Sequence, residues 1–167
     1  MITEEFITIP EERMKLLKAD PRIVKKIQDL TGVKIGLNED VSIDCEDSIL
    51  RNRVKEFFKA FGRGFTSETA LNLLDEEYIL EIIEISKYSG KSQDRQKVLK
   101  ARVIGKEGKA KKKIEKDCDV KISVYGKTVW IIGKWEKINL ARESVENLLR
   151  GSRHTSVYRF LEERKIS

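Results

Sequence analysis

The residues of this chain best suited to chemistry are a pair of glycines and the lysines that follow them. Gly105-Lys106-Glu107-Gly108 precedes five lysines between residues 109 and 116. Glycines remove side chains where a polyanion backbone must come close, and a helix that starts after them offers unpaired N–H groups to phosphate oxygens. The lysines add long-range attraction. The pattern therefore predicts a clamp for the backbone of a nucleic acid.

The sequence contains few residues that could support catalysis or bind a metal. The single histidine, His154, has no nucleophile or acid placed beside it by a motif, and Cys45 and Cys118 lie far from any C-x-x-C spacing. We therefore expect no metal site, no cofactor and no catalysis, so the chain should not be an enzyme. The glycine pair also lacks the GxxxxGK[ST] spacing of a nucleotide-binding P-loop.

An internal repeat supplies the elements that must position the clamp. With the chain offset by 87 residues, segment 16–35 aligns with segment 103–122, and 6 of the 20 positions are identical. Unrelated sequences would give about one identity, so a duplicated module is indicated. The repeat sets Lys18-Ala19-Asp20-Pro21 opposite the glycine pair. Because aspartate repels phosphate and proline lacks an N–H, the first copy should serve packing or protein contact.

Hydrophobic patterning predicts the order β-α-α-β-β-α in both copies. The elements expected in the first copy are 6–9, 11–17, 22–30, 33–37, 41–45 and 50–61. Those expected in the second copy are 79–85, 93–104, 109–117, 120–125, 128–132 and 138–149, with further helices over 67–74 and 153–165. The fold class is therefore α+β, with two tandem modules, each a three-stranded antiparallel sheet covered by three helices.

Charge separates the two modules, which we expect at residues 1–76 and 77–167. Residues 1–90 carry 13 basic and 18 acidic side chains, a net charge of −5, whereas residues 91–167 carry 21 and 10, a net charge of +11. The second half alone has the electrostatics of a polyanion binder. The chain shows no leader peptide and no membrane-spanning run, so we expect a cytoplasmic monomer.

The element order, with IGKEG between two helices, resembles the type I KH domain, whose GxxG loop clamps four nucleotides. A narrower resemblance rests on ARVIGKEGKAKKKIE (101–115) and VWIIGKWEKINLARESVENLLRGSRHTSVYRFLE (129–162). Both segments are similar to archaeal members of the Dim-two, or partner-of-Nob, family of paired-KH factors that mature the small ribosomal subunit. The divergent first copy also resembles that family.

The resemblance implies a nonenzymatic adaptor that binds single-stranded RNA near the 3′ end of the small-subunit rRNA. It also implies a Nob-type endonuclease as a partner, which the adaptor would position, and a translation initiation factor as a further partner. The expected RNA-binding residues are Ile104, Gly105, Lys106, Glu107, Gly108, Lys109, Lys112, Lys113, Lys121, Ile122, Tyr125, Lys127, Arg153 and His154.

Three aromatic residues receive separate interpretations. Trp130 is expected in the core, Trp135 is a candidate for contact with a partner, and Tyr125 is expected in the loop between two strands, where it could stack on a base. We also expect the glycine pair to be exposed, so that replacing Gly105 and Gly108 by aspartate would abolish binding and leave the fold intact.

Two other functions remain open from the sequence. One is a general KH RNA-binding protein in translation regulation, which differs in the RNA that it would bind. The other is a protein–protein scaffold with a vestigial RNA surface, which would bind no single-stranded RNA. The sequence does not give the base preference, because KH grooves read bases by shape and backbone edges.

Overall fold

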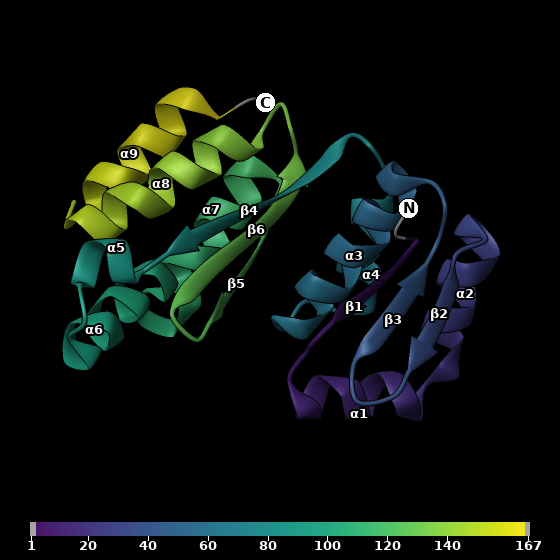
Figure 1. Ribbon diagram of the computed structural model, residues 1–167. Coiled ribbons are helices and arrows are strands. Elements are labelled where there is room, and N and C mark those ends of the chain that lie inside the picture. Colours follow the sequence, from purple (N-terminus) through teal and green to yellow (C-terminus); the bar gives the residue numbers. More distant parts are fainter. Residues whose placement is uncertain (1–2, 166–167) are drawn as a thin grey trace. The chain divides into compact units, whose positions relative to one another are not determined.

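The computed structural model describes residues 3–165, and the chain divides into two compact units between Glu76 and Glu77. Each unit is built on a three-stranded antiparallel sheet with helices packed on one face (Figure 1). Both units follow the order β-α-α-β-β-α, with additional short helices in places. The α+β class and the three-stranded antiparallel sheets are therefore confirmed.

The first unit has its strands in the spatial order β1-β3-β2, so β3 is central. The strands are β1 (Glu4–Ile7), β2 (Lys34–Leu37) and β3 (Val41–Asp44). The helices are α1 (Glu11–Ala19), α2 (Pro21–Thr31), α3 (Ser48–Gly62) and α4 (Ser67–Leu71), followed by the 3₁₀ turn η1 (Asn72–Leu74). The predicted connecting helix over 67–74 is therefore split between α4 and η1.

The second unit repeats this topology with the strand order β4-β6-β5. Its strands are β4 (Tyr78–Glu84), β5 (Lys121–Tyr125) and β6 (Thr128–Lys134). Its helices are α5 (Ser86–Ser89), α6 (Gln93–Ile104), η2 (Lys106–Gly108), α7 (Lys109–Cys118), α8 (Ile138–Arg150) and α9 (His154–Arg164).

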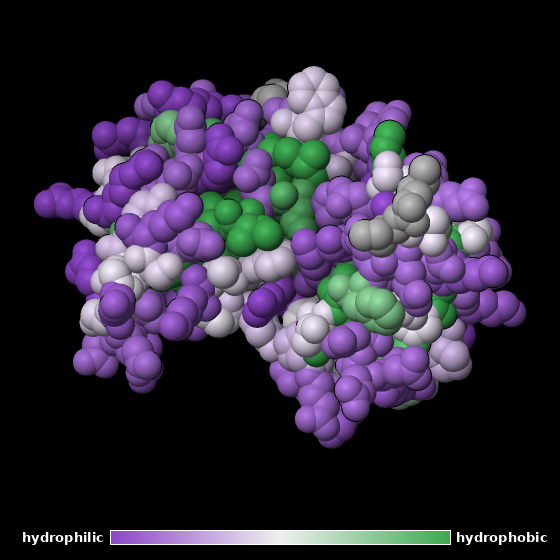
Figure 2. Space-filling model, in the orientation of Figure 1, coloured by the Kyte–Doolittle hydropathy of each residue, from purple (hydrophilic) through white to green (hydrophobic). Residues whose placement is uncertain are grey.

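In the second unit, the residues of β6 from Val129 to Gly133 are all buried, so both faces of this strand are covered. In β6, Val129 and Ile131 are fully buried and belong to the core formed with α6, α7, α8 and α9. Trp130 between them is 6% exposed, as the sequence predicted. On the face that the helices leave open, hydrophobic side chains gather over β4 and β6 (Figure 2). Ile82 of β4 is 47% exposed.

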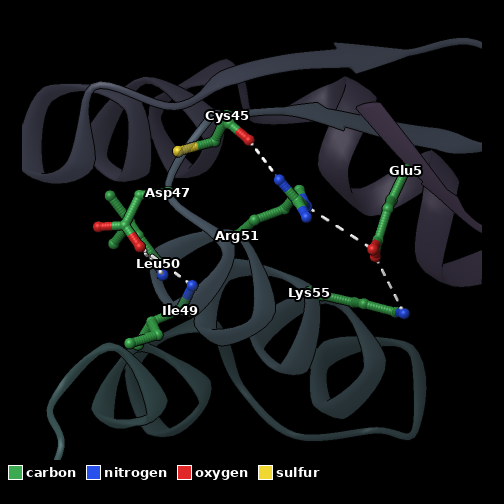
Figure 3. A network of polar contacts seen from close by, with 7 residues as sticks. All are labelled: Glu5, Cys45, Asp47, Ile49, Leu50, Arg51 and Lys55. Atoms are coloured by element: carbon green, nitrogen blue, oxygen red, sulfur yellow. Dashed lines mark hydrogen bonds and ion pairs between the residues drawn. The ribbon is translucent and has the colours of Figure 1, made fainter. Parts of the chain in front are cut away.

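A polar network fixes the start of α3, the long helix of the first unit (Figure 3). Asp47 caps the helix, because its Oδ1 accepts hydrogen bonds from the N–H groups of Ile49 and Leu50 at 3.0 and 3.2 Å. Arg51 and Lys55 on the following turns pair with Glu5 of β1, with the Lys55 ammonium 3.0 Å from the carboxylate. These cations lower the pKa of Glu5, chiefly through the hydrogen bond from Lys55. The network therefore ties α3 to the edge of the sheet.

The second unit differs from the predicted three helices per sheet. The one-turn helix α5 follows β4, where the fully buried Ile85 pulls the chain back onto the core and Gly90, with φ of 65°, ends the turn. Four residues are too few to carry a helical period, so α5 could not be predicted from the sequence. Between residues 3 and 165, no helix combines the length and the apolar character needed to cross a membrane.

Candidate nucleic-acid interface

The GxxG loop (residues 105–108) joins α6 to α7 and has an unusual backbone. Gly105, Glu107 and Gly108 all have positive φ, at 77°, 57° and 76°. Glu107 is one of only two residues other than glycine with positive φ in the described part of the chain. Both middle side chains are exposed, so the loop presents its backbone and Lys106 to solvent.

Gly105 is also required by the fold, and here our expectation was wrong. A Cβ at Gly105 would lie 2.7 Å from the backbone nitrogen and from the Cβ of Ala110, which is fully buried. A Cβ at Gly108 would meet only the far end of the Lys112 side chain, at 3.6 Å. Replacing Gly105 by aspartate would therefore strain the turn between α6 and α7, so the double aspartate variant cannot separate binding from folding.

The start of α7 is open to an anion. Gly108 precedes the helix, and no side chain among residues 3–165 caps it. The Lys109 N–H donates to the carbonyl oxygen of Lys106, and the N–H groups that follow it in the first turn have no side-chain acceptor, as a phosphate-binding helix start requires. Lys109 and Lys112 lie exposed on the first turn, and the Lys112 ammonium is 3.5 Å from the carbonyl oxygen of Glu107.

In the first unit, a carboxylate of the chain itself occupies the corresponding helix start, at α2. In the KADP loop (residues 18–21), the Asp20 carboxylate accepts a hydrogen bond from the Arg22 N–H at 3.2 Å and caps α2. The Arg22 guanidinium also bonds to Asp20 at 2.8 Å, and this contact lowers the pKa of Asp20. Pro21 removes a further N–H at the first helical position. A phosphate would therefore meet a helix start that is already occupied.

The lysines of α7 differ in their contacts. The Lys113 ammonium lies 2.9 Å from Asp117 and 2.6 Å from Glu162 of α9. Its hydrogen bonds to these carboxylates, first that to Glu162, raise the pKa of Lys113. Lys113, which we expect to contact RNA, is therefore already held in ion pairs. Lys109 and Lys112 are exposed.

Strand β5 forms the other side of the candidate interface. The chain reverses at Asp119, with φ of 52°, so β5 runs back along α7 toward the loop (Figure 1). The Glu115 carboxylate of α7 accepts a hydrogen bond from the Ile122 N–H at 2.9 Å and holds the two elements together. Since β5 pairs only with β6 among the described residues, its outer edge faces this side of the unit.

Of the residues expected on β5 and the following turn, Lys121 and Lys127 are exposed, whereas the Ile122 side chain is buried. Its side chain is 3% exposed and packs in the core, since strand alternation turns it inward. Tyr125 is the last residue of β5, paired with Thr128, rather than a loop residue. It is half-buried at the end of the strand.

A group of contacts that the sequence did not reveal connects α9 to the helix before the loop. The Arg102 guanidinium of α6 donates hydrogen bonds to the carbonyl oxygens of Leu148, at 2.9 Å, and Ser152. In return, the His154 Nε2 donates to the carbonyl oxygen of Arg102 at 2.8 Å. The His154 ring packs edge-on against Tyr158. We call these five residues the Arg102 network.

The Arg102 network changes the role expected of His154. Its Nε2 is committed to a backbone carbonyl, so the ring positions α9 against α6 instead of contacting RNA through that nitrogen. The Tyr158 ring lies 5.9 Å from the ammonium groups of both Lys109 and Lys113. Arg153, the residue before α9, is exposed. Ile104, at the end of α6, is 36% exposed beside the loop.

Other chemistry has little support in the described residues. Between residues 3 and 165, no group of three or more histidine, cysteine, aspartate or glutamate side chains could hold a metal ion. Burial, with a smaller contribution from Asp117, raises the pKa of the Cys118 thiol to about 12, so this cysteine is not a nucleophile. The GxxG loop, which joins α6 to α7 and precedes a helix start without a side-chain cap, therefore remains the best candidate for a ligand.

Comparison with known proteins agrees with this geometry. Residues 79–166 match the second KH domain of PNO1, described as a eukaryotic type KH-domain of type I. A KH domain-containing protein of Methanocaldococcus jannaschii is 39% identical over 165 residues, which cover 95% of this chain and 72% of the relative. Pre-rRNA-processing protein PNO1 of Gibberella zeae is 32% identical over 173 residues. This chain covers 63% of that fungal protein.

Solved structures extend the likeness to both units. Dim2p from Pyrococcus horikoshii OT3 has a TM-score of 0.85 and 36% identity, with coverage of 98% of this chain and 100% of that chain. A Dim2p chain in a complex of a/eIF2alpha, aDim2p and rRNA from the same organism has a TM-score of 0.85 and 36% identity, with coverage of 96% and 93%.

Proposed function

Because the chain belongs to the PNO1/Dim2 family of KH-domain proteins, we propose that its second unit binds single-stranded RNA near the 3′ end of the small-subunit rRNA. Family membership makes the chain an RNA-binding protein of pre-rRNA processing rather than an enzyme. The specific RNA segment and the residues that contact it are part of the proposal.

The observation that carries the proposal is the contrast between the two helix starts. The start of α7 follows two glycines and lacks a side-chain cap, whereas Asp20 caps the start of α2. An open helix start with nearby lysines holds a phosphate by N–H hydrogen bonds and by charge. Of these two corresponding helix starts, the one in the second unit therefore has the features that a nucleic-acid backbone needs.

In the proposed complex, the GxxG loop and the first turn of α7 hold consecutive phosphates. Lys106, Lys109 and Lys112 supply the charge around them, and Lys121 and Lys127 extend it along β5. Bases then lie between α7 and the outer edge of β5, which offers backbone groups for hydrogen bonding. At the loop end of that edge, the Tyr125 ring is placed to stack on a base.

We further propose two protein partners. One is a Nob-type endonuclease, which the bound chain would position at the 3′ end of the rRNA. The other is the α subunit of initiation factor 2, since a Pyrococcus horikoshii relative has been crystallised with that protein and rRNA. This role implies a cytoplasmic location.

RNA binding is tested with the full chain and a fluorescently labelled RNA of the small-subunit 3′ end. Lys109→Glu with Lys112→Glu should weaken binding at least tenfold, because two positive charges beside the phosphates become negative. The matched control is Lys25→Glu with Lys26→Glu, which makes the same change of charge on α2, the corresponding helix of the first unit, and should change affinity less than twofold. A larger loss in the control would place the RNA on the first unit and contradict the proposal.

The adaptor role needs a separate measurement. We expect the wild-type chain to increase the rate at which a Nob-type endonuclease cleaves a precursor RNA, and the Lys109→Glu/Lys112→Glu variant to lose this effect. If RNA binding is normal but the cleavage rate does not change, the chain binds rRNA without positioning the endonuclease.

A further inference from the structure

The first unit keeps a groove at the place where the second unit has its candidate RNA interface. The groove has a volume of 510 Å³ and lies between the KADP loop, α2 and β2. Its floor is apolar and its rim is basic. The lining includes Leu17, Pro21, Val24 and Leu37 on the floor, and Lys18, Arg22 and Lys25 on the rim.

The groove has lost its means of holding phosphate. Asp20 occupies the N–H groups at the start of α2, and its carboxylate also neutralises Arg22 through a contact of 2.8 Å. A nucleic-acid backbone would bring another negative charge against this carboxylate. We therefore expect a ligand of this groove to carry its negative charge away from the start of α2.

The positive charge of the rim contrasts with the negative net charge of the first unit. Residues 1–76 contain 12 basic and 15 acidic side chains, a net charge of −3. Lys18 and Lys25 nevertheless face the same groove, and both are exposed. Their ammonium groups complement carboxylates that approach over the apolar floor, where a Lys–carboxylate pair is screened less than on an open surface.

Strand β2 provides the second requirement for a peptide ligand. It pairs with β3 on one side, and among residues 3–165 no strand pairs with its other side. An extended peptide can add to such an edge through main-chain hydrogen bonds, while its alternate side chains point into neighbouring pockets. Leu37 belongs to β2 and lines the groove, so the free edge and the groove are continuous.

We propose that this groove binds an extended acidic peptide from a partner protein. One apolar side chain of the peptide lies on the floor beside Val24 and Leu37, and flanking carboxylates pair with Lys18 and Lys25. The inference is independent of RNA binding by the second unit, because the two grooves share no residue.

The experiment is a selection of random seven-residue peptides displayed on phage against the immobilised full chain. We expect enrichment of peptides in which acidic residues flank an apolar one. A labelled synthetic peptide of the enriched sequence should bind Lys25→Glu at least tenfold more weakly than wild type. Lys26→Glu, an exposed neighbour on α2 that does not line the groove, is the matched control and should bind normally.

Each other outcome overturns the proposal. No enrichment over the starting library would show that the groove has no peptide ligand of this kind. Equal binding to wild type and Lys25→Glu would place the peptide elsewhere. If Lys25→Glu instead weakens binding of a single-stranded oligouridine probe, the groove binds nucleic acid. Thermal melts of both variants check that the exposed substitutions leave the fold intact.

Discussion

Lys112 and Lys113 are adjacent on α7, and the structure predicts opposite consequences when each is replaced by glutamine. Lys112 is exposed beside the GxxG loop, with its ammonium 3.5 Å from the Glu107 carbonyl oxygen. Lys113 is held between Asp117, whose side chain is 5% exposed, and Glu162. Lys112→Gln should therefore weaken RNA binding, whereas Lys113→Gln should lower the free energy of unfolding.

The size of each effect follows from the contacts. Losing one phosphate contact with a single strand makes the slope of log K against log salt shallower by about 0.7. At about 0.15 M salt, that change corresponds to a loss of roughly fourfold in affinity, or about 0.8 kcal/mol, from counterion release. Lys113→Gln leaves the buried Asp117 carboxylate without its cation, which should cost about 1–3 kcal/mol of unfolding free energy.

The assay is fluorescence anisotropy of one labelled RNA at four salt concentrations, with urea unfolding of each variant. We expect a shallower salt slope for Lys112→Gln only, and a lower unfolding midpoint for Lys113→Gln only. The reasoning would be refuted if Lys113→Gln made the salt slope shallower by as much as Lys112→Gln. That result would mean that Lys113 leaves its ion pairs to meet RNA.

Three further predictions concern stability. Gly105→Ala should lower the unfolding free energy by about 2–4 kcal/mol, because the new Cβ adds a clash to the backbone strain. Gly108→Ala should lower it by about 1 kcal/mol, because it adds backbone strain alone. Similar midpoints of urea unfolding for the two variants would contradict this reasoning. Hydrogen bonds from Lys113 and Lys165 lower the pKa of Glu162 to about 2, so the stability that it adds is complete above about pH 4.5 and is lost as the pH falls toward 2. Thermal melts over that range should show a weaker pH dependence for Glu162→Gln, and an unchanged dependence would count against the ion pairs. Arg102→Met should lower the unfolding free energy by about 2–4 kcal/mol and speed amide exchange in α9, whereas exposed Arg95→Met on the same helix should do neither.

The periodic part of the molecule could be predicted from the sequence. The apolar stripe of Ala110, Ile114 and Cys118 fixes the buried side of α7, and all three side chains are buried as the spacing requires. The helix bounds of α6 agree with the prediction at both ends, because Ser92 caps the start and Gly105 follows the last residue. The residues that bury or end these helices lie within the helices or directly beside them, so the local sequence is enough to predict them.

The candidate site was harder to predict, since its residues depend on distant partners. Glu162 lies 49 residues after Lys113, and no local pattern announces that ion pair. The Arg102 network was missed for a similar reason, because its acceptors are backbone carbonyls, which every residue has. Ile122 is different: the alternation of buried Val120, exposed Lys121 and buried Ile122 was visible in the sequence. The period of two already places the Ile122 side chain in the core, so a contact of this residue with RNA would be made through its backbone.

The Arg102 network also imposes an order on biosynthesis. Domains form as the chain is made, N-terminal parts first. Every element of the second sheet and the GxxG loop precedes α9 in the chain, yet the helix before that loop makes hydrogen bonds with residues 152 and 154. A nascent chain that has exposed the GxxG loop but not α9 therefore has an incompletely held loop. The chain should gain full affinity for RNA only after α9 has emerged, which delays binding during translation.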